Sequence, residues 1–416
     1  MKVINLLLDG IGDRSYKVLD NKTPLDYART PNLDEIAKTS QCGLMTPLDY
    51  GKVLGTDLAH FILFGYTLQE YPNRSVIDAL GEGIKLDKKT LVLRASFANV
   101  AKKDEGFLIK ERFCKNLKKE EIKKIIKKIN RNINGYEFKV IHSYDSHCII
   151  LVKGGKLLEK ISDSDPFYSP QYAMKIEPFE TNEDLAFKTS DLINKFLKEN
   201  FKILNNLNLN KIRKNQNLKK ANFILTKWAG KFKKLDSFEK RTGKTGLILA
   251  KSDLFKGISK ILDIDYFRYK SFDKAVDLAL KSKKEYIHLH TKLPDSASHK
   301  KDPFLKVKEI EKIDKKIKKL LDFKGLLIVT GDHSTPCSGK MIHSGESVPF
   351  MAKGKFVRVD DVKEFNEISC SKGSVFIKGK DFIPFIQNAS DTAKLYHLKQ
   401  GTKRFNYRIK NINKLK

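Results

Sequence analysis

Asp332 and His333 stand side by side after a short apolar stretch, residues 326–330, and His343 follows ten residues after His333. The stretch predicts a strand that is buried on both faces. A carboxylate and an imidazole at the carboxyl end of such a strand commonly hold a divalent metal. An Asp–His pair can also do no more than satisfy each other, so this pair alone leaves both interpretations open.

Two further places in the chain offer the same kinds of group. Asp9 directly follows the apolar stretch 3–8, although a turn residue would also fit there. Asp295 and His299 follow a predicted strand, residues 286–290, and are four residues apart. On a helical turn these two side chains face the same way. The alternative is that Asp295 caps a helix and His299 lies on the surface.

Thr56 offers a hydroxyl group in the sequence GTDLAH, residues 55–60. The simplest interpretation is that Thr56 or Asp57 caps a short helix. The same position has a chemical use, because unpaired N–H groups and the positive end of the helix dipole favour phosphate there. A metal beside the hydroxyl could turn it into a nucleophile.

Together these places supply carboxylates, imidazoles and one hydroxyl, all expected at the carboxyl ends of strands. Mixed oxygen and nitrogen ligands suit Mn²⁺ best, with Zn²⁺ or Mg²⁺ as alternatives. Two such ions about 3.5–4 Å apart stabilise the attacking and leaving oxygens of a phosphoryl transfer. The sequence therefore predicts a two-metal site made of seven residues: Asp9, Thr56, Asp295, His299, Asp332, His333 and His343.

The elements that must position these groups alternate between strand and helix, which predicts an α/β core with a mostly parallel sheet flanked by helices. From residue 91 the pattern changes to short β-like stretches with one helix, which predicts an inserted α+β domain. We expect the core at 1–89 and 182–398, the insertion at 90–181 and a basic tail at 399–416.

The composition narrows the class of protein. Apolar residues make up 40% of the 416 residues, and no apolar run approaches a membrane span of about 20 residues. The five cysteines form no CxxC pair, which fits reduced thiols in the cytoplasm. The net charge of +31 comes from lysines that aromatic residues do not interleave, so we expect attraction for small anions and no nucleic-acid partner. The sequence does not predict an oligomeric state.

The order of motifs along nearly the whole chain resembles the archaeal-type, cofactor-independent phosphoglycerate mutases of the alkaline phosphatase superfamily. The matching stretches include LLLDGIGD (6–13), KTPLDYARTPNLDEIAK (22–38), GTDLAH (55–60), DALGEGI (78–84), RASFA (94–98), ISDSDP (161–166), DPFLKVKEIEKID (302–314), TGDHSTP (330–336) and HSGESVP (343–349).

The resemblance implies roles for these residues. One metal would bind Asp295, His299 and His343, and the other would bind Asp9, Thr56, Asp332 and His333. A phospho-enzyme at Thr56 would carry the phosphoryl group between the 3- and 2-hydroxyls of glycerate. The inserted domain would act as a lid, and the implied substrate-binding residues are Arg74, Arg94, Arg112, Lys115 and Lys227.

The chain departs from the family pattern at several of these positions. Thr56 replaces a serine, and its methyl group restricts the side chain. Lys115 and Lys227 stand where the family has arginines, and a lysine lacks the bidentate fork of arginine. Phe167 replaces a histidine. The primary expectation is therefore a phosphoglycerate mutase, and the alternatives are a phosphatase or phosphomutase for another small phosphate ester, or a catalytically idle binding or structural paralogue.

Overall fold

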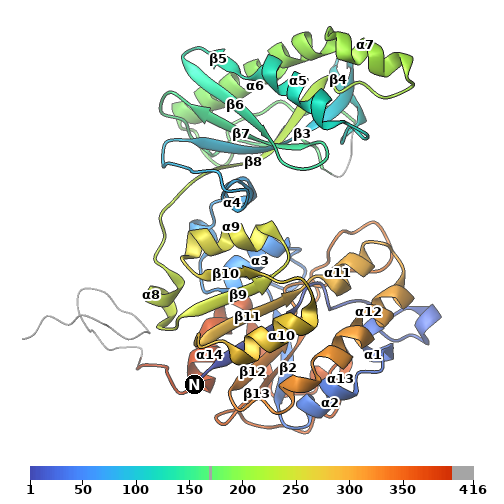
Figure 1. Ribbon diagram of the computed structural model, residues 1–416, viewed down its shortest axis with the longest axis vertical. Helices are drawn as coiled ribbons and strands as arrows, with labels where there is room; N and C mark the ends of the chain where they lie inside the picture. The colour runs from blue at the N-terminus through green and yellow to red at the C-terminus, as the bar shows by residue number, and fades with distance from the viewer. Residues whose placement is uncertain (168–170, 396–416) are drawn as a thin grey trace, which may run out of the picture. The chain divides into compact units, whose positions relative to one another are not determined.

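The computed structural model describes residues 1–167 and 171–395, which form two compact units (Figure 1). The core unit contains residues 1–71 and continues from Leu235, and the inserted unit is Pro72–Lys234. The inserted unit is wider than the expected 90–181, because two later elements belong to its sheet. Strand β8 (Phe223–Lys231) pairs with β3 (Leu91–Lys103), and helix α6 (Asp184–Asn205) packs against β8. The predicted tail at 399–416 lies outside the described residues.

The core unit is built on an eight-stranded sheet that is mostly parallel, as predicted. Of its eight strands, β13 runs antiparallel to both neighbours, and the other pairs are parallel. The order across the sheet is β10 (Asp265–Arg268), β9 (Gly246–Ala250), β11 (Tyr286–Thr291), β1 (Val3–Leu8), β12 (Leu326–Thr330), β13 (Val348–Lys353), β2 (Gln41–Thr46) and β14 (Val375–Lys378).

Helices cover both faces of this sheet. Helices α2 (Pro31–Ala37), α10 (Phe272–Lys281) and α12 (Pro303–Lys316) share one apolar cluster with the side chains of β1 that point to that face. On the other face, α3 (Thr56–Leu63) and α9 (Asp253–Leu262) bring His60 and Phe255 against His288 of β11. This three-layer α/β arrangement confirms the predicted fold class.

The start of α3 corrects one detail of the sequence analysis. The prediction that Thr56 or Asp57 caps this helix was wrong, because Gly55 is the N-cap residue and Thr56 is the first residue of the helix. The shorter helices of the core unit are α1 (Pro24–Tyr27), α8 (Phe238–Thr242), α11 (Leu293–Ser298), α13 (Glu367–Cys370) and α14 (Phe382–Ala389).

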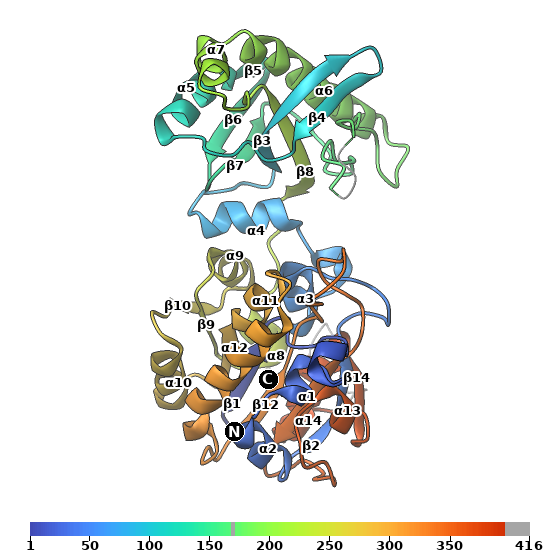
Figure 2. The same ribbon diagram turned by 90° about the vertical axis from the view of Figure 1, so that its right-hand side faces the viewer.

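The inserted unit is an α+β unit with an antiparallel sheet, as expected (Figure 2). Its strands, besides β3 and β8, are β4 (Gly106–Glu111), β5 (Arg131–Ile133), β6 (Tyr136–His142) and β7 (His147–Lys153). Helices α5 (Lys119–Ile129) and α6 cover one face, where the rings of Phe138 and Phe196 stack with centroids 4.2 Å apart. Helix α4 (Arg74–Gly81) packs against β3 and β8, and α7 is Asn208–Asn215.

A membrane span needs a long helix of high mean hydropathy. Within residues 1–167 and 171–395, none of the helices combines that length with that apolar content.

Candidate active site

The sheet of the core unit brings the predicted site residues to one edge. Strands β11, β1 and β12 are adjacent and parallel, so their carboxyl ends meet there. Asp9 directly follows β1, and Asp332 and His333 follow β12. Asp295 and His299 lie in and just after α11, which follows β11. The parallel pairing therefore explains how residues far apart in the sequence become neighbours.

Asp295, His299 and His343 form the first group. One ligand atom from each lies within 4.8 Å of the others. The Nε2 atom of His299 is 3.1 Å from Asp295 Oδ1, and that of His343 is 3.6 Å from the same oxygen. His343 Nδ1 donates a hydrogen bond of 2.7 Å to the carbonyl oxygen of Leu54. Because a carbonyl can only accept, the proton is on Nδ1 and the Nε2 lone pair of His343 is free to bind a cation.

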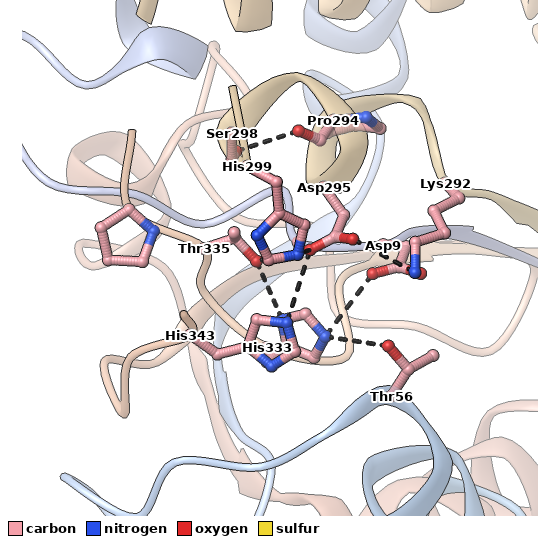
Figure 3. A network of polar contacts seen from close by, with 12 residues as sticks. Asp9, Thr56, Lys292, Pro294, Asp295, Ser298, His299, His333, Thr335 and His343 are labelled. Atoms are coloured by element: carbon pink, nitrogen blue, oxygen red, sulfur yellow. Dashed lines mark hydrogen bonds and ion pairs between the residues drawn. The ribbon is translucent and has the colours of Figure 1, made fainter. Parts of the chain in front are cut away.

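Asp9, Asp295 and His333 form the second group, again with ligand atoms within 4.8 Å of one another (Figure 3). His333 Nε2 lies 3.5 Å from Asp9 Oδ1 and 3.3 Å from the hydroxyl oxygen of Thr56. Asp332 joins them, with Oδ2 at 3.2 Å from His333 Nε2. All seven residues that the sequence singled out thus lie together, and we call them the acidic cluster.

Thr335, which the sequence analysis did not single out, sets the proton on His333. Its hydroxyl donates to Asp295 Oδ1 at 3.0 Å and therefore accepts from His333 Nδ1 at 3.1 Å. This leaves the Nε2 lone pair of His333 facing the carboxylates. Burial, and then the neighbouring His343, lowers the pKa of His333 to about 3, so the ring is neutral at pH 7. Neutral imidazole is the form that binds metals.

The carboxylates of the acidic cluster are crowded in a buried place. Burial, and then repulsion by Asp9, raises the pKa of Asp332 well above its ordinary value. Three buried carboxylate oxygens of the acidic cluster make no hydrogen bond, Asp9 Oδ1, Asp295 Oδ2 and Asp332 Oδ2, although Asp295 Oδ2 has an ion pair with Lys292 Nζ at 3.4 Å. Buried acceptors without a hydrogen-bond donor are costly, and a bound cation satisfies them and offsets the repulsion between the carboxylates. The donor set therefore fits divalent metal ions.

A second set of contacts, which the sequence analysis missed, holds the acidic cluster in place. His290 Nε2 donates to Asp9 Oδ2 at 3.1 Å, and the N–H of Gly10 donates to Asp332 Oδ1 at 3.1 Å. His290 ends the predicted strand 286–290, so its position at a strand end was a usable signal.

Lys306 of α12 is a further support for this edge. Its ammonium group is fully buried, pairs with Asp13 Oδ2 at 3.0 Å, and donates to the carbonyl oxygens of Gly12 and Thr335, each at 3.1 Å. These two carbonyls belong to the loops that follow β1 and β12. Lys306 therefore ties together the two loops that follow Asp9 and His333.

The inserted unit contains a separate set of charged residues. Arg94 and Arg74 both bind Asp78, at 2.6 and 3.1 Å. Arg112 makes a bidentate pair with Asp165, at 2.5 and 2.9 Å, and Lys227 Nζ is 3.2 Å from the same carboxylate. Strand pairing places Arg94 opposite Lys227, so these pairs adjoin. We call the four cations and two carboxylates the basic cluster.

Aromatic side chains surround part of the basic cluster. The guanidinium of Arg112 lies 4.4 Å from the ring centroid of Phe167, and Lys227 Nζ lies 4.6 Å from that of Trp228. Both aromatic residues have positive φ, 61° and 57°, which is strained for a bulky side chain. His147, the first residue of β7, is also near these cations: burial, and then the positive charge of Arg94, lowers the pKa of His147 to about 4.

Lys115 differs from the other predicted substrate-binding residues. It is exposed, and its backbone oxygen accepts a hydrogen bond of 3.1 Å from Arg213. Arg213 is fully buried and also pairs with Glu121 at 3.0 Å. The structure thus gathers Arg74, Arg94, Arg112 and Lys227 but does not place Lys115 among the ion pairs of the basic cluster.

Comparison with known proteins agrees with this geometry. Residues 1–381 match the model of the metalloenzyme superfamily, which is the class that the fold and the acidic cluster define. The 2,3-bisphosphoglycerate-independent phosphoglycerate mutase 2 of Methanocaldococcus jannaschii is 47% identical over 410 residues, 96% of each chain. A 2,3-bisphosphoglycerate-independent phosphoglycerate mutase of Sulfurisphaera tokodaii is 31% identical over 95% of this chain and 98% of its own.

Two solved structures share the fold of this chain. The cofactor-independent phosphoglycerate mutase of Thermoplasma acidophilum is 26% identical, with a TM-score of 0.64 over 94% of this chain and 100% of its own. The PH0037 protein from Pyrococcus horikoshii is 27% identical, with a TM-score of 0.76 over 95% of this chain and 99% of its own. The chain belongs to the family of archaeal 2,3-bisphosphoglycerate-independent phosphoglycerate mutases.

Proposed function

We propose that this protein is a metal-dependent phosphoglycerate mutase that interconverts 3-phosphoglycerate and 2-phosphoglycerate in the cytoplasm, as a step of glycolysis and gluconeogenesis. The observation that carries the proposal is the position of Thr56. Its hydroxyl oxygen is 3.3 Å from His333 Nε2, at the first residue of α3 and beside the buried carboxylates. A hydroxyl in that place can attack a phosphoryl group whose charge the helix N-terminus favours.

The transfer would take place in two steps. Thr56 Oγ1 loses its proton and forms a bond to phosphorus while the bond from phosphorus to the 3-oxygen of glycerate breaks, and that oxygen takes up a proton. The 2-hydroxyl then loses its proton and attacks phosphothreonine, the bond from phosphorus to Thr56 Oγ1 breaks, and Oγ1 takes up a proton. The same glycerate must stay bound between the steps, and water must stay out.

The acidic cluster would hold two divalent ions, with Mn²⁺ as the first candidate, Zn²⁺ as an alternative, and Mg²⁺ less favoured because of the imidazoles. Asp295, His299 and His343 would bind one ion, and Asp9, Thr56, Asp332 and His333 would bind the other. When bound, the ions supply Lewis acidity that activates the hydroxyl and stabilises the charge of the phosphoryl group.

We assign the small phosphorylated substrate to the basic residues of the inserted unit, namely Arg74, Arg94, Arg112, Lys115 and Lys227. One observation favours a second function, hydrolysis of a phosphate ester. Asp78 and Asp165 already pair with four of these cations, which weakens their hold on an anionic glycerate. A loosely held glycerate would leave, and water would then attack phosphothreonine.

The test follows phosphorus directly. We expect the purified protein with Mn²⁺ and 3-phosphoglycerate to form 2-phosphoglycerate, measured by ³¹P NMR after the Mn²⁺ has been removed with a chelator. Thr56→Ala removes the attacking oxygen and should abolish the reaction, whereas the matched control Thr56→Ser keeps the oxygen and should remain active. Release of inorganic phosphate without 2-phosphoglycerate would replace the mutase with a phosphatase. Undiminished turnover by Thr56→Ala would overturn the role of Thr56.

A further inference from the structure

Four buried polar residues lie where α3 packs against the sheet, three of them on the sheet and one on the helix. Asn5 of β1 is paired in register with His288 of β11, and His290 is two residues further along the same strand. His60 of α3 packs edge-on against His288, with centroids 5.0 Å apart at 84°. All four are at most 2% exposed. So much buried polarity directly behind the acidic cluster calls for a physical role.

The hydrogen bonds fix which nitrogen of His60 carries the proton. His60 Nδ1 is 2.6 Å from the carbonyl oxygen of Thr56, one helical turn earlier. A carbonyl only accepts, so the proton is on Nδ1 and the lone pair is on Nε2. The same Nδ1 is 3.5 Å from Asp332 Oδ2. The Nδ1–H group of His60 thus faces both the proposed nucleophile residue and a carboxylate of the acidic cluster.

The opposite arrangement holds in His288. Asn5 Nδ2 lies 3.1 Å from His288 Nδ1. An amide N–H only donates, so Nδ1 of His288 accepts and its proton is on Nε2. His60 Nε2 and His288 Nε2 are both buried and make no hydrogen bond. One of these nitrogens is an acceptor and the other a donor, and they belong to rings in contact, so their polarities are complementary.

We propose that Asn5 and His288 reinforce the tautomer of His60 that the Thr56 carbonyl selects, and that His60 in turn positions Thr56 for attack. If His60 took the other tautomer, its Nδ1 lone pair would face the carbonyl oxygen of Thr56 and the carboxylate of Asp332, and both contacts would become repulsive. His290 is a separate support, because it donates to Asp9 instead. This proposal rests on Thr56 being the nucleophile, and it makes Asn5, His60 and His288 positioning residues.

A double-mutant cycle tests the coupling. His288→Phe keeps the ring shape among the neighbouring rings of Phe64 and Phe255 but removes the donor. We expect this variant to lower kcat about fivefold, less than the loss of a strong hydrogen bond, because the two Nε2 atoms belong to rings in contact but make no hydrogen bond; KM for 3-phosphoglycerate should change little. In a His60→Asn background the amide N–H replaces Nδ1–H without any tautomer to select. In this His60→Asn background, adding His288→Phe should change kcat less than about twofold.

Equal losses of kcat in both backgrounds would overturn the proposal, because the effect would then be general damage to the core. Circular dichroism and melting temperature check that each variant folds. Asn5→Leu is a second variant, which removes the donor to His288 and leaves both histidines in place. We expect it to lower kcat as His288→Phe does when His60 is present, and to have little effect on kcat in the His60→Asn background.

The tautomers can also be read in the wild-type protein without any assay. In the full chain with diamagnetic Mg²⁺, long-range ¹H–¹⁵N correlation spectra should show His60 protonated on Nδ1 and His288 on Nε2. A His288 protonated on Nδ1 would overturn the relay while leaving the proposed reaction intact. Loss of mutase activity in the wild type would instead overturn the proposed function, so the two failures are distinguishable.

Discussion

The acidic cluster of the core unit and the basic cluster of the inserted unit satisfy their charges differently. In the acidic cluster three carboxylates crowd together, and an oxygen of each makes no hydrogen bond. In the basic cluster each carboxylate binds two cations, Asp78 with Arg74 and Arg94, and Asp165 with Arg112 and Lys227. The first cluster needs a cation to be satisfied, whereas the second is largely satisfied by its own residues. This contrast indicates that metal ions complete the core site, while the inserted unit is preformed.

The largest effect should come from Asp295→Asn, because Asp295 belongs to both ligand groups. We expect loss of bound metal and a fall in activity of more than about 100-fold, since changes to outer contacts of a metal site already cost up to that amount. Metal content by elemental analysis is the measurement. Asp302→Asn is the matched control, because Asp302 only caps α12 and asparagine caps equally well. Unchanged metal content in Asp295→Asn would contradict the conclusion that the acidic cluster, unlike the basic cluster, is completed by metal ions.

A smaller effect, of a different kind, should come from Asp165→Asn. Removing this carboxylate leaves Arg112 and Lys227 close together without compensation, and breaking such a buried pair costs about 3–5 kcal/mol. We expect a lower melting temperature whether or not Mn²⁺ is present. By contrast, Mn²⁺ should raise the melting temperature of the wild type and not that of Asp295→Asn. A metal-dependent loss in Asp165→Asn would mean that the two clusters do not differ as described.

The smallest effect concerns Glu367, which accepts hydrogen bonds from the N–H of Asp13 at 3.0 Å and from Thr23 at 2.6 Å. Burial raises the pKa of Glu367 from 4.5 to about 7. Between these two values the folded state binds more protons than the unfolded state, so this group makes stability fall as pH rises. Glu367→Gln should flatten the pH dependence of the free energy of unfolding in that window. Glu364→Gln, at an exposed position, is the control. If Glu367→Gln had the same pH dependence of the free energy of unfolding as the wild type, the raised pKa of Glu367 would be contradicted.

Much of the acidic cluster could be predicted because it follows from local rules. Asp332 and His333 directly follow an apolar run, and the four-residue spacing of Asp295 and His299 places both on one side of a helical turn. Parallel strands then bring these groups to one edge. The cap of α3 was mispredicted, since a hydroxyl at the start of a helix fits both the N-cap and the first helical position.

The remaining features depend on contacts between distant parts of the chain. Strand β8 joins the inserted sheet beside β3 more than a hundred residues after it, so the bounds of that unit could not be read from local patterns. His60 and His288 look like ordinary residues of a helix and a strand until the fold packs them together. Lys115 was expected with the cations by family resemblance, but the chain exposes it.

The buried ammonium group of Lys306 has a consequence for the order in which the protein matures. It bonds to Gly12, 294 residues earlier in the chain, and to Thr335, 29 residues later. During synthesis Asp9 and Thr56 leave the ribosome long before either contact can form. Five of the seven residues of the acidic cluster lie at or beyond Asp295, so the complete cluster can form only after the chain has been translated as far as His343, the same stretch that supplies Lys306 and Thr335.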